Sequence, residues 1–133
     1  MKVYIFGNED LAEDNRAFEV AKQLRASLRG IEFIKVKPNE DLPFANEGRV
    51  IIMDTVWGIK NVEVLGNQDL DRLALSPRAS VHDFDLGWQL KYLKKLGKLG
   101  EVIIIGLPMQ GEIDYRLIHS IFKKLVAQDI QGS

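Results

Sequence analysis

Two acidic side chains and one histidine stand where this 133-residue chain could build a metal site. Asp14 comes shortly after the first apolar run, Asp54 directly follows the apolar run 50–53, and His82 opens a later helical pattern. Open α/β sheets bind their ligands in the crevice at the carboxyl ends of their strands, so the three side chains could meet there. Two carboxylates and an imidazole are a ligand set suited to zinc, nickel, iron or manganese. The pattern therefore predicts a three-ligand metal site with open coordination positions.

Each of these residues also has a plainer interpretation. Asp14 is one of four acidic residues between positions 9 and 14, which could cap a helix and complement its dipole. Asp54 could accept hydrogen bonds from the amides of a turn, and His82 could be a loop histidine that pairs with a neighbouring carboxylate. The second histidine, His119, falls inside the last helical pattern, and we expect it to be structural.

The composition excludes several classes of function. The chain has no cysteine, which rules out thiol catalysis, zinc–thiolate sites and disulfides. A net charge of -1 argues against a nucleic-acid partner, because non-specific binding to nucleic acid needs a basic surface. No segment approaches the roughly 18 apolar residues of a membrane span, and the first apolar run is too short for a signal peptide. We therefore expect a cytoplasmic protein without a membrane partner.

Strand patterns alternate with helix patterns along the chain. Strands are predicted over residues 3–6, 31–36, 50–53 and 102–105, with a short edge strand over 61–65, and helices over 12–28, 83–96 and 113–127. Such alternation is typical of a mostly parallel sheet that is covered on both faces. The fold prediction is a single domain over residues 1–133, a three-layer α/β/α sandwich with about five strands.

Glycines and leucines refine this prediction. Gly30 is expected to stop the first helix and Gly106 to close the last strand. The second helix should turn Leu86, Leu90 and Leu93 inward, and the last helix should do so with Leu117, Ile121 and Leu125. Lys91, Lys94, Lys95 and Lys98 gather near the end of the second helix, where its dipole favours cations.

Three motifs in order resemble those of the hydrogenase maturation proteases. They are Gly-Asn-x-x-Leu-x-Glu-Asp over residues 7–14, Ile-Ile-Met-Asp over 51–54, and Ser-Val-His-x-x-x-Leu over 80–86. The apolar frame between them also corresponds, from residue 1 to about residue 127. The resemblance places the metal ligands of that family on Asp14, Asp54 and His82.

The resemblance implies a nickel-recognising endopeptidase. Such an enzyme removes the C-terminal extension from the large-subunit precursor of a nickel-iron hydrogenase after nickel has been inserted. The nickel would be presented by the substrate rather than bound permanently by the protease. Hydrolysis of the peptide bond would be promoted in one of two ways. Either the metal polarises the scissile carbonyl, or a carboxylate activates the attacking water. The catalytic carboxylates would be Asp14 and Asp54, with Glu13 a weaker choice of base.

Two other functions remain open from the sequence. A receiver-like signalling domain also has acidic residues after its first strand and an aspartate after its third, here Asp54. It further needs a lysine at the end of its last strand, where this chain has Gly106, Leu107 and Pro108. The other alternative is a relative of the proteases that binds a metal but does not cleave.

Overall fold

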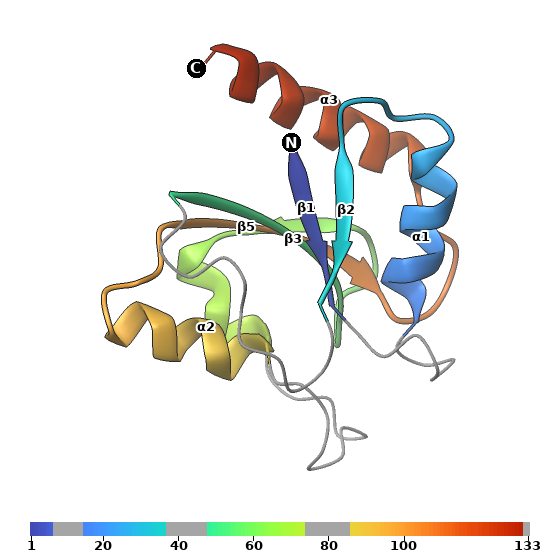
Figure 1. Ribbon diagram of the computed structural model, residues 1–133. Helices are drawn as coiled ribbons and strands as arrows, with labels where there is room; N and C mark the ends of the chain where they lie inside the picture. Colours follow the sequence, from blue (N-terminus) through green and yellow to red (C-terminus); the bar gives the residue numbers. More distant parts are fainter. Residues whose placement is uncertain (7–14, 37–47, 74–85, 132–133) are drawn as a thin grey trace.

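The computed structural model describes residues 1–6, 15–36, 48–73 and 86–131, and its centre is a five-stranded sheet (Figure 1). The strands lie in the order β2-β1-β3-β5-β4, and all neighbours are parallel except β4, which pairs with β5 in the antiparallel sense. Their bounds are β1 Lys2–Ile5, β2 Glu32–Lys35, β3 Arg49–Val56, β4 Glu63–Leu65 and β5 Glu101–Pro108. The predicted fold class is confirmed.

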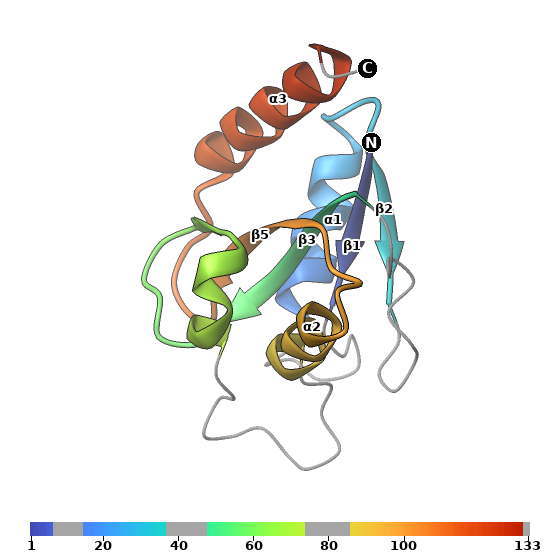
Figure 2. The same cartoon turned by 90° about the vertical axis from the view of Figure 1, so that its left-hand side faces the viewer.

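Helices cover both faces of this sheet (Figures 1 and 2). The helices α1 (Arg16–Arg25) and α3 (Tyr115–Gln131) pack on one face, and α2 (Leu86–Lys95) packs on the other together with the 3-10 helix η1 (Asn67–Leu73). Among the described helices, none is long and apolar enough to cross a membrane.

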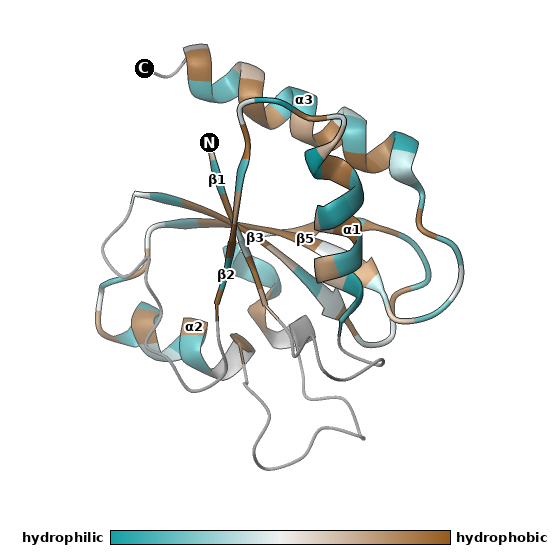
Figure 3. Cartoon of the chain, turned by 45° about the vertical axis from the view of Figure 1, so that its right-hand side comes forward, coloured by the Kyte–Doolittle hydropathy of each residue, from teal (hydrophilic) through white to brown (hydrophobic). Residues whose placement is uncertain are grey.

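The two central strands explain why the sheet is buried on both sides. β3 and β5 pair over eight residues, from Arg49 opposite Glu101 to Val56 opposite Pro108. Residues 50–53 of β3 are all buried, as a continuous apolar run in a parallel sheet requires. Alternate side chains enter the two cores, with Ile51 on the α1 and α3 face and Ile52 on the α2 face. Figure 3 shows the hydrophobic colour concentrated on the strands at the centre of the molecule.

Both central strands are longer than the sequence predicted. β3 continues past Met53 to Val56, and β5 continues through Gly106 to Pro108. The two extensions pair with each other, so each strand supplies the hydrogen bonds that prolong the other. Gly106 does not close β5: a Cβ atom there would lie only 3.0 Å from Cγ2 of Val56, so the glycine allows close packing inside the strand.

The helices depart from prediction in phase and in length. In α3, Leu125 is buried as predicted and Ile121 packs partly buried against the core. Leu117, however, is 39% exposed, and the fully buried positions are Ile118 and Phe122, one residue further along the helix than Leu117 and Ile121. The last helix also continues to Gln131. In α2, by contrast, Leu86 and Leu90 are buried as predicted.

The first helix ends at Arg25, well before Gly30. The amides of Ser27 and Leu28 both donate to the carbonyl oxygen of Leu24, which finishes the helix without a glycine. Gly30 instead takes a φ of 81° in the turn that leads into β2. Residues 12–14 of the predicted helix lie outside the described part of the chain.

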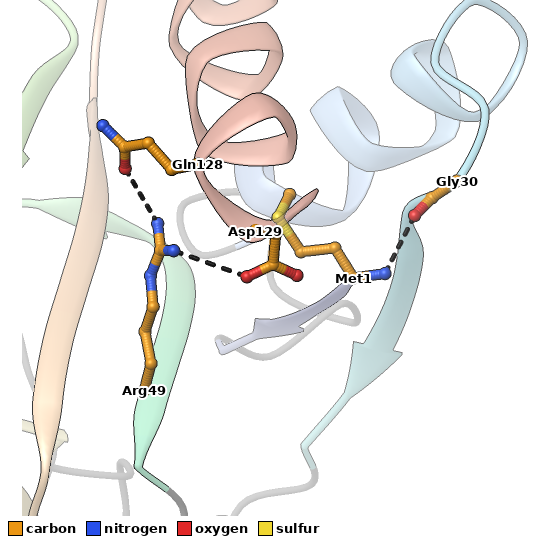
Figure 4. Close-up of polar contacts among 5 residues, drawn as sticks. All are labelled: Met1, Gly30, Arg49, Gln128 and Asp129. Atoms are coloured by element: carbon orange, nitrogen blue, oxygen red, sulfur yellow. Dashed lines mark hydrogen bonds and ion pairs between the residues drawn. The ribbon is translucent and has the colours of Figure 1, made fainter. Parts of the chain in front are cut away.

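Polar contacts fasten the amino end of the sheet (Figure 4). The N-terminal ammonium of Met1 donates to the carbonyl oxygen of Gly30 at 2.9 Å. The Arg49 guanidinium, at the start of β3, reaches the end of α3, with Nη1 3.4 Å from Asp129 Oδ1 and Nη2 3.3 Å from Gln128 Oε1. These contacts lie far from the carboxyl ends of the strands, and they are structural.

Candidate functional site

Asp54 lies on the central strand β3, close to the carboxyl edge of the sheet. It stands opposite Gly106 of β5, and on its other side the register of β1 reaches Ile5 opposite Met53. The amide of Phe6, the next residue of the chain, donates to the carbonyl oxygen of Met53 at 3.3 Å. Asp54 thus lies between two parallel strands, β1 and β5, and β1 ends beside it.

The prediction that the strand ends at Met53 was wrong by three residues, because β3 continues to Val56 and so includes Asp54. The side chain is half-buried, and its Oδ1 accepts a hydrogen bond from the amide of Thr55 at 2.8 Å. This local bond fixes the direction of the carboxylate. A hydrogen bond to a neighbouring amide is also what the sequence predicted for Asp54 as the alternative to a metal contact.

The strand order makes this position significant. From β1 the chain goes to β2 on one side, and β3 then returns to the other side of β1. The carboxyl edge between β1 and β3 is therefore the topological switch point, where open α/β sheets form their binding crevices. Asp54 stands at this switch point.

Strand alternation places Asp54 on the α2 face of the sheet. Its neighbours two positions away on the strand, Ile52 and Val56, belong to the core on that face, as do Phe6 and Leu86. Leu86 is the first residue of α2 and is buried there. The α2 helix thus begins with a residue that is anchored in the core on the same face as Asp54.

Asp14, Glu13 and His82 lie outside the described residues, so the proposed three-ligand set stays a prediction. Within the described ranges, no group of three or more histidine, aspartate or glutamate side chains could hold a metal ion. His119, for which the sequence predicted a structural role, has its Nε2 3.1 Å from Ser27 Oγ and so links α3 to the segment that follows α1.

The start of α1 is fixed at the carboxyl end of β5. The guanidinium of Arg16, the first residue of α1, donates through Nη1 to the carbonyl oxygen of Pro108 at 2.6 Å and through Nη2 to that of Gly111. Arg16 comes two positions after Asp14 in the sequence. The segment that carries Asp14 therefore leads into a helix held at this edge of the sheet.

A pocket that sequence reasoning missed lies just beyond β3 and β5. It encloses about 590 Å³ and is lined by residues 57–60 and 109–111, which follow directly on the two strands. Trp57, among these lining residues, is 54% exposed. A tryptophan followed by glycine, three residues after Asp54, was the available signal.

The fold is similar to that of two endopeptidases of known structure. The chain superposes on the hydrogenase maturating endopeptidase HybD from E. coli with a TM-score of 0.65 and 17% identity, covering 100% of this chain and 94% of that one. A solution structure of an endopeptidase from Escherichia coli gives a TM-score of 0.63 at 18% identity, covering 96% and 91% of the two chains. At these identities the similarity shows a shared fold over the whole chain. No protein-family model matches the sequence, and no curated protein matches it.

Proposed function

We propose that this protein is a nickel-recognising endopeptidase that removes the C-terminal extension of a nickel-iron hydrogenase large-subunit precursor. The observation that carries the proposal is the position of Asp54. The residue stands at the topological switch point of a fold that is shared, over the full chain, with a hydrogenase maturating endopeptidase. The ordered motifs over residues 7–14, 51–54 and 80–86 add independent support from the sequence.

The proposed metal contacts are Asp14, Asp54 and His82, and the nickel belongs to the substrate. Carboxylate oxygens and an imidazole nitrogen suit nickel as ligands. A site that contacts a nickel ion already held by the precursor would distinguish a loaded precursor from an empty one. The reaction is expected in the cytoplasm, and the partner is the precursor protein.

The proposed catalytic carboxylates are Asp14 and Asp54. One of them takes a proton from water as the water oxygen attacks the scissile carbonyl carbon. The carbon–nitrogen bond then breaks, and the proton passes to the departing amine. The Thr55 amide supports this role for Asp54, because it holds one carboxylate oxygen in place at 2.8 Å before any substrate binds.

The receiver-like alternative is not favoured by the sheet. Receiver-like doubly wound domains have the strand order 2-1-3-4-5. Here β5 lies next to β3, and β4 is an antiparallel edge strand. In addition, the end of β5 offers Gly106, Leu107 and Pro108 where a lysine would be needed to pair with a phosphoryl group.

The direct test is cleavage of the precursor. The protein is incubated with nickel-loaded and with nickel-free large-subunit precursor, and mass spectrometry follows the loss of the C-terminal peptide. Cleavage of the loaded precursor alone supports both the peptidase activity and its dependence on nickel. Binding of the precursor without cleavage would favour a non-proteolytic relative, and equal cleavage of both forms would remove nickel recognition from the proposal.

A further inference from the structure

We propose that the pocket beyond β3 and β5 binds a large apolar side chain of the precursor, located within a few residues of the scissile bond. This inference rests on the proposed function and deepens it by naming a feature of the substrate. The pocket is formed by residues 57–60 and 109–111, and we call it the Trp57 pocket. Its occupant is an extended peptide segment of the precursor.

The Trp57 pocket is large enough to take a side chain of the substrate together with neighbouring peptide groups. Its volume of about 590 Å³ lies within the range of roughly 300–1,000 Å³ that is usual for ligand sites. Trp57 and Ile59 on one side, and Met109 on the other, supply apolar surface, while Lys60 and Gln110 add a similar share of polar surface. Gly58 and Gly111 have φ angles of 88° and 87°, so each lining segment contains a turn that other residues would rarely adopt.

The register of the strands brings the pocket close to Asp54. Trp57 comes three residues after Asp54, and Met109 comes three residues after Gly106, the partner of Asp54 in the register. At about 3.3 Å per residue, the pocket begins roughly 10 Å beyond Asp54 along the strand direction. An extended peptide covers the same distance in about three residues. A peptide bond held at Asp54 therefore leaves a side chain about three positions away within reach of the pocket.

The polar groups around the pocket favour this occupant. Arg16 holds the wall at residues 108–111 through its two hydrogen bonds to Pro108 and Gly111, so this wall is preformed. Lys60 is the charged residue among the described lining residues. An acidic group beside the apolar side chain would complement it. Arg16 acts here as a positioning residue.

The pocket is tested by cleavage kinetics with Trp57→Ala and Trp57→Phe. Loss of an aromatic anchor commonly costs about tenfold or more in binding, so Trp57→Ala should raise KM about tenfold or more and change kcat by less than about threefold. Trp57→Phe should recover most of the loss, because it keeps an apolar ring. The matched control is Tyr92→Ala, since Tyr92 is 52% exposed and lies on α2, outside the pocket lining. The control should cleave like the wild type.

A nickel-free synthetic peptide that spans the precursor's cleavage site supplies a readout independent of catalysis. Its affinity should fall about tenfold with Trp57→Ala. It should also fall when one large apolar residue within about three positions of the scissile bond becomes alanine. Lys60→Glu should weaken binding severalfold, and the effect should shrink as salt is added.

The outcomes separate this inference from the proposed function. Nickel-dependent cleavage that is unaffected by Trp57→Ala, with no sensitive apolar residue in the peptide, would overturn the pocket and leave the peptidase. Trp57-dependent binding of the peptide without cleavage of any precursor would support the pocket as a peptide site and overturn the peptidase. Neither binding nor cleavage by the wild-type protein would overturn both.

Discussion

Replacing Asp54 by asparagine should remove the peptidase activity and leave the fold nearly as stable. Asp54 Oδ1 accepts a hydrogen bond from the Thr55 amide at 2.8 Å, and the carbonyl oxygen of an asparagine can accept the same bond. A hydrogen bond to a charged group contributes about 1.5–3 kcal/mol and a neutral one about 0.5–1.5 kcal/mol. The expected loss in the free energy of unfolding is therefore about 1 kcal/mol, which corresponds to a few degrees in Tm for a chain of this size.

The activity should fall much further than the stability. An asparagine cannot take a proton from water and is a weaker metal ligand than a carboxylate. Loss of a general base typically lowers the rate by about 10²- to 10⁴-fold. The assay is the rate at which nickel-loaded precursor loses its C-terminal peptide, measured beside thermal unfolding of the same preparation.

Asp69→Asn is the matched control for this experiment. Asp69 is also half-buried, and its Oδ2 accepts a hydrogen bond from the Gly66 amide at 2.9 Å. It lies in η1, after β4, away from the carboxyl edge. The control should lose a similar amount of stability and keep full activity. If Asp54→Asn cleaves within about threefold of the wild type, Asp54 has only a structural role and the reasoning from the switch point is wrong.

Three further changes have expected outcomes. His82→Ala should abolish cleavage of nickel-loaded precursor and keep the wild-type circular dichroism spectrum; loss of folding would instead make His82 a structural residue. Phe122→Ala should lower the free energy of unfolding by about 3–5 kcal/mol in urea titrations. The reason is that the ring is fully buried and packs edge-to-face on Phe33, with the ring centroids 6.0 Å apart. A loss below about 1 kcal/mol would contradict that packing. Arg49→Met should change the free energy of unfolding by no more than about 1 kcal/mol, because the ion pair with Asp129 is near the surface. In addition, the buried Arg49 Nε has no hydrogen-bond partner among the described residues. A larger loss would show that the ion pair holds α3 in place.

Local patterns in the sequence were enough to predict the layers of the fold. The run Val50-Ile51-Ile52-Met53 was predicted as a central strand, and β3 confirms it, because a strand buried on both faces must be apolar at every position. In the same way, Leu86 and Leu90 were predicted to face the core from their helical spacing, and both are buried. The period of the apolar residues is a property of a single segment, so a single segment reveals it.

The lengths of the central strands and the buried face of α3 depend on contacts between distant segments of the chain. β3 and β5 extend to Val56 and Pro108 because each pairs with the other, which neither segment reveals alone. Apolar residues at 117, 118, 121 and 122 give α3 two overlapping apolar stripes, and contact with Phe33 places the stripe of Phe122 inside.

The same division holds for the candidate site. The sequence by itself determined that an acidic residue, Asp54, follows a buried apolar run near the end of a strand. Only the tertiary structure decided that this strand lies at the topological switch point and that residues 57–60 and 109–111 close a pocket beyond it. The physical reason is that strand order and register depend on hydrogen bonds between segments about fifty residues apart, such as those that pair Asp54 with Gly106.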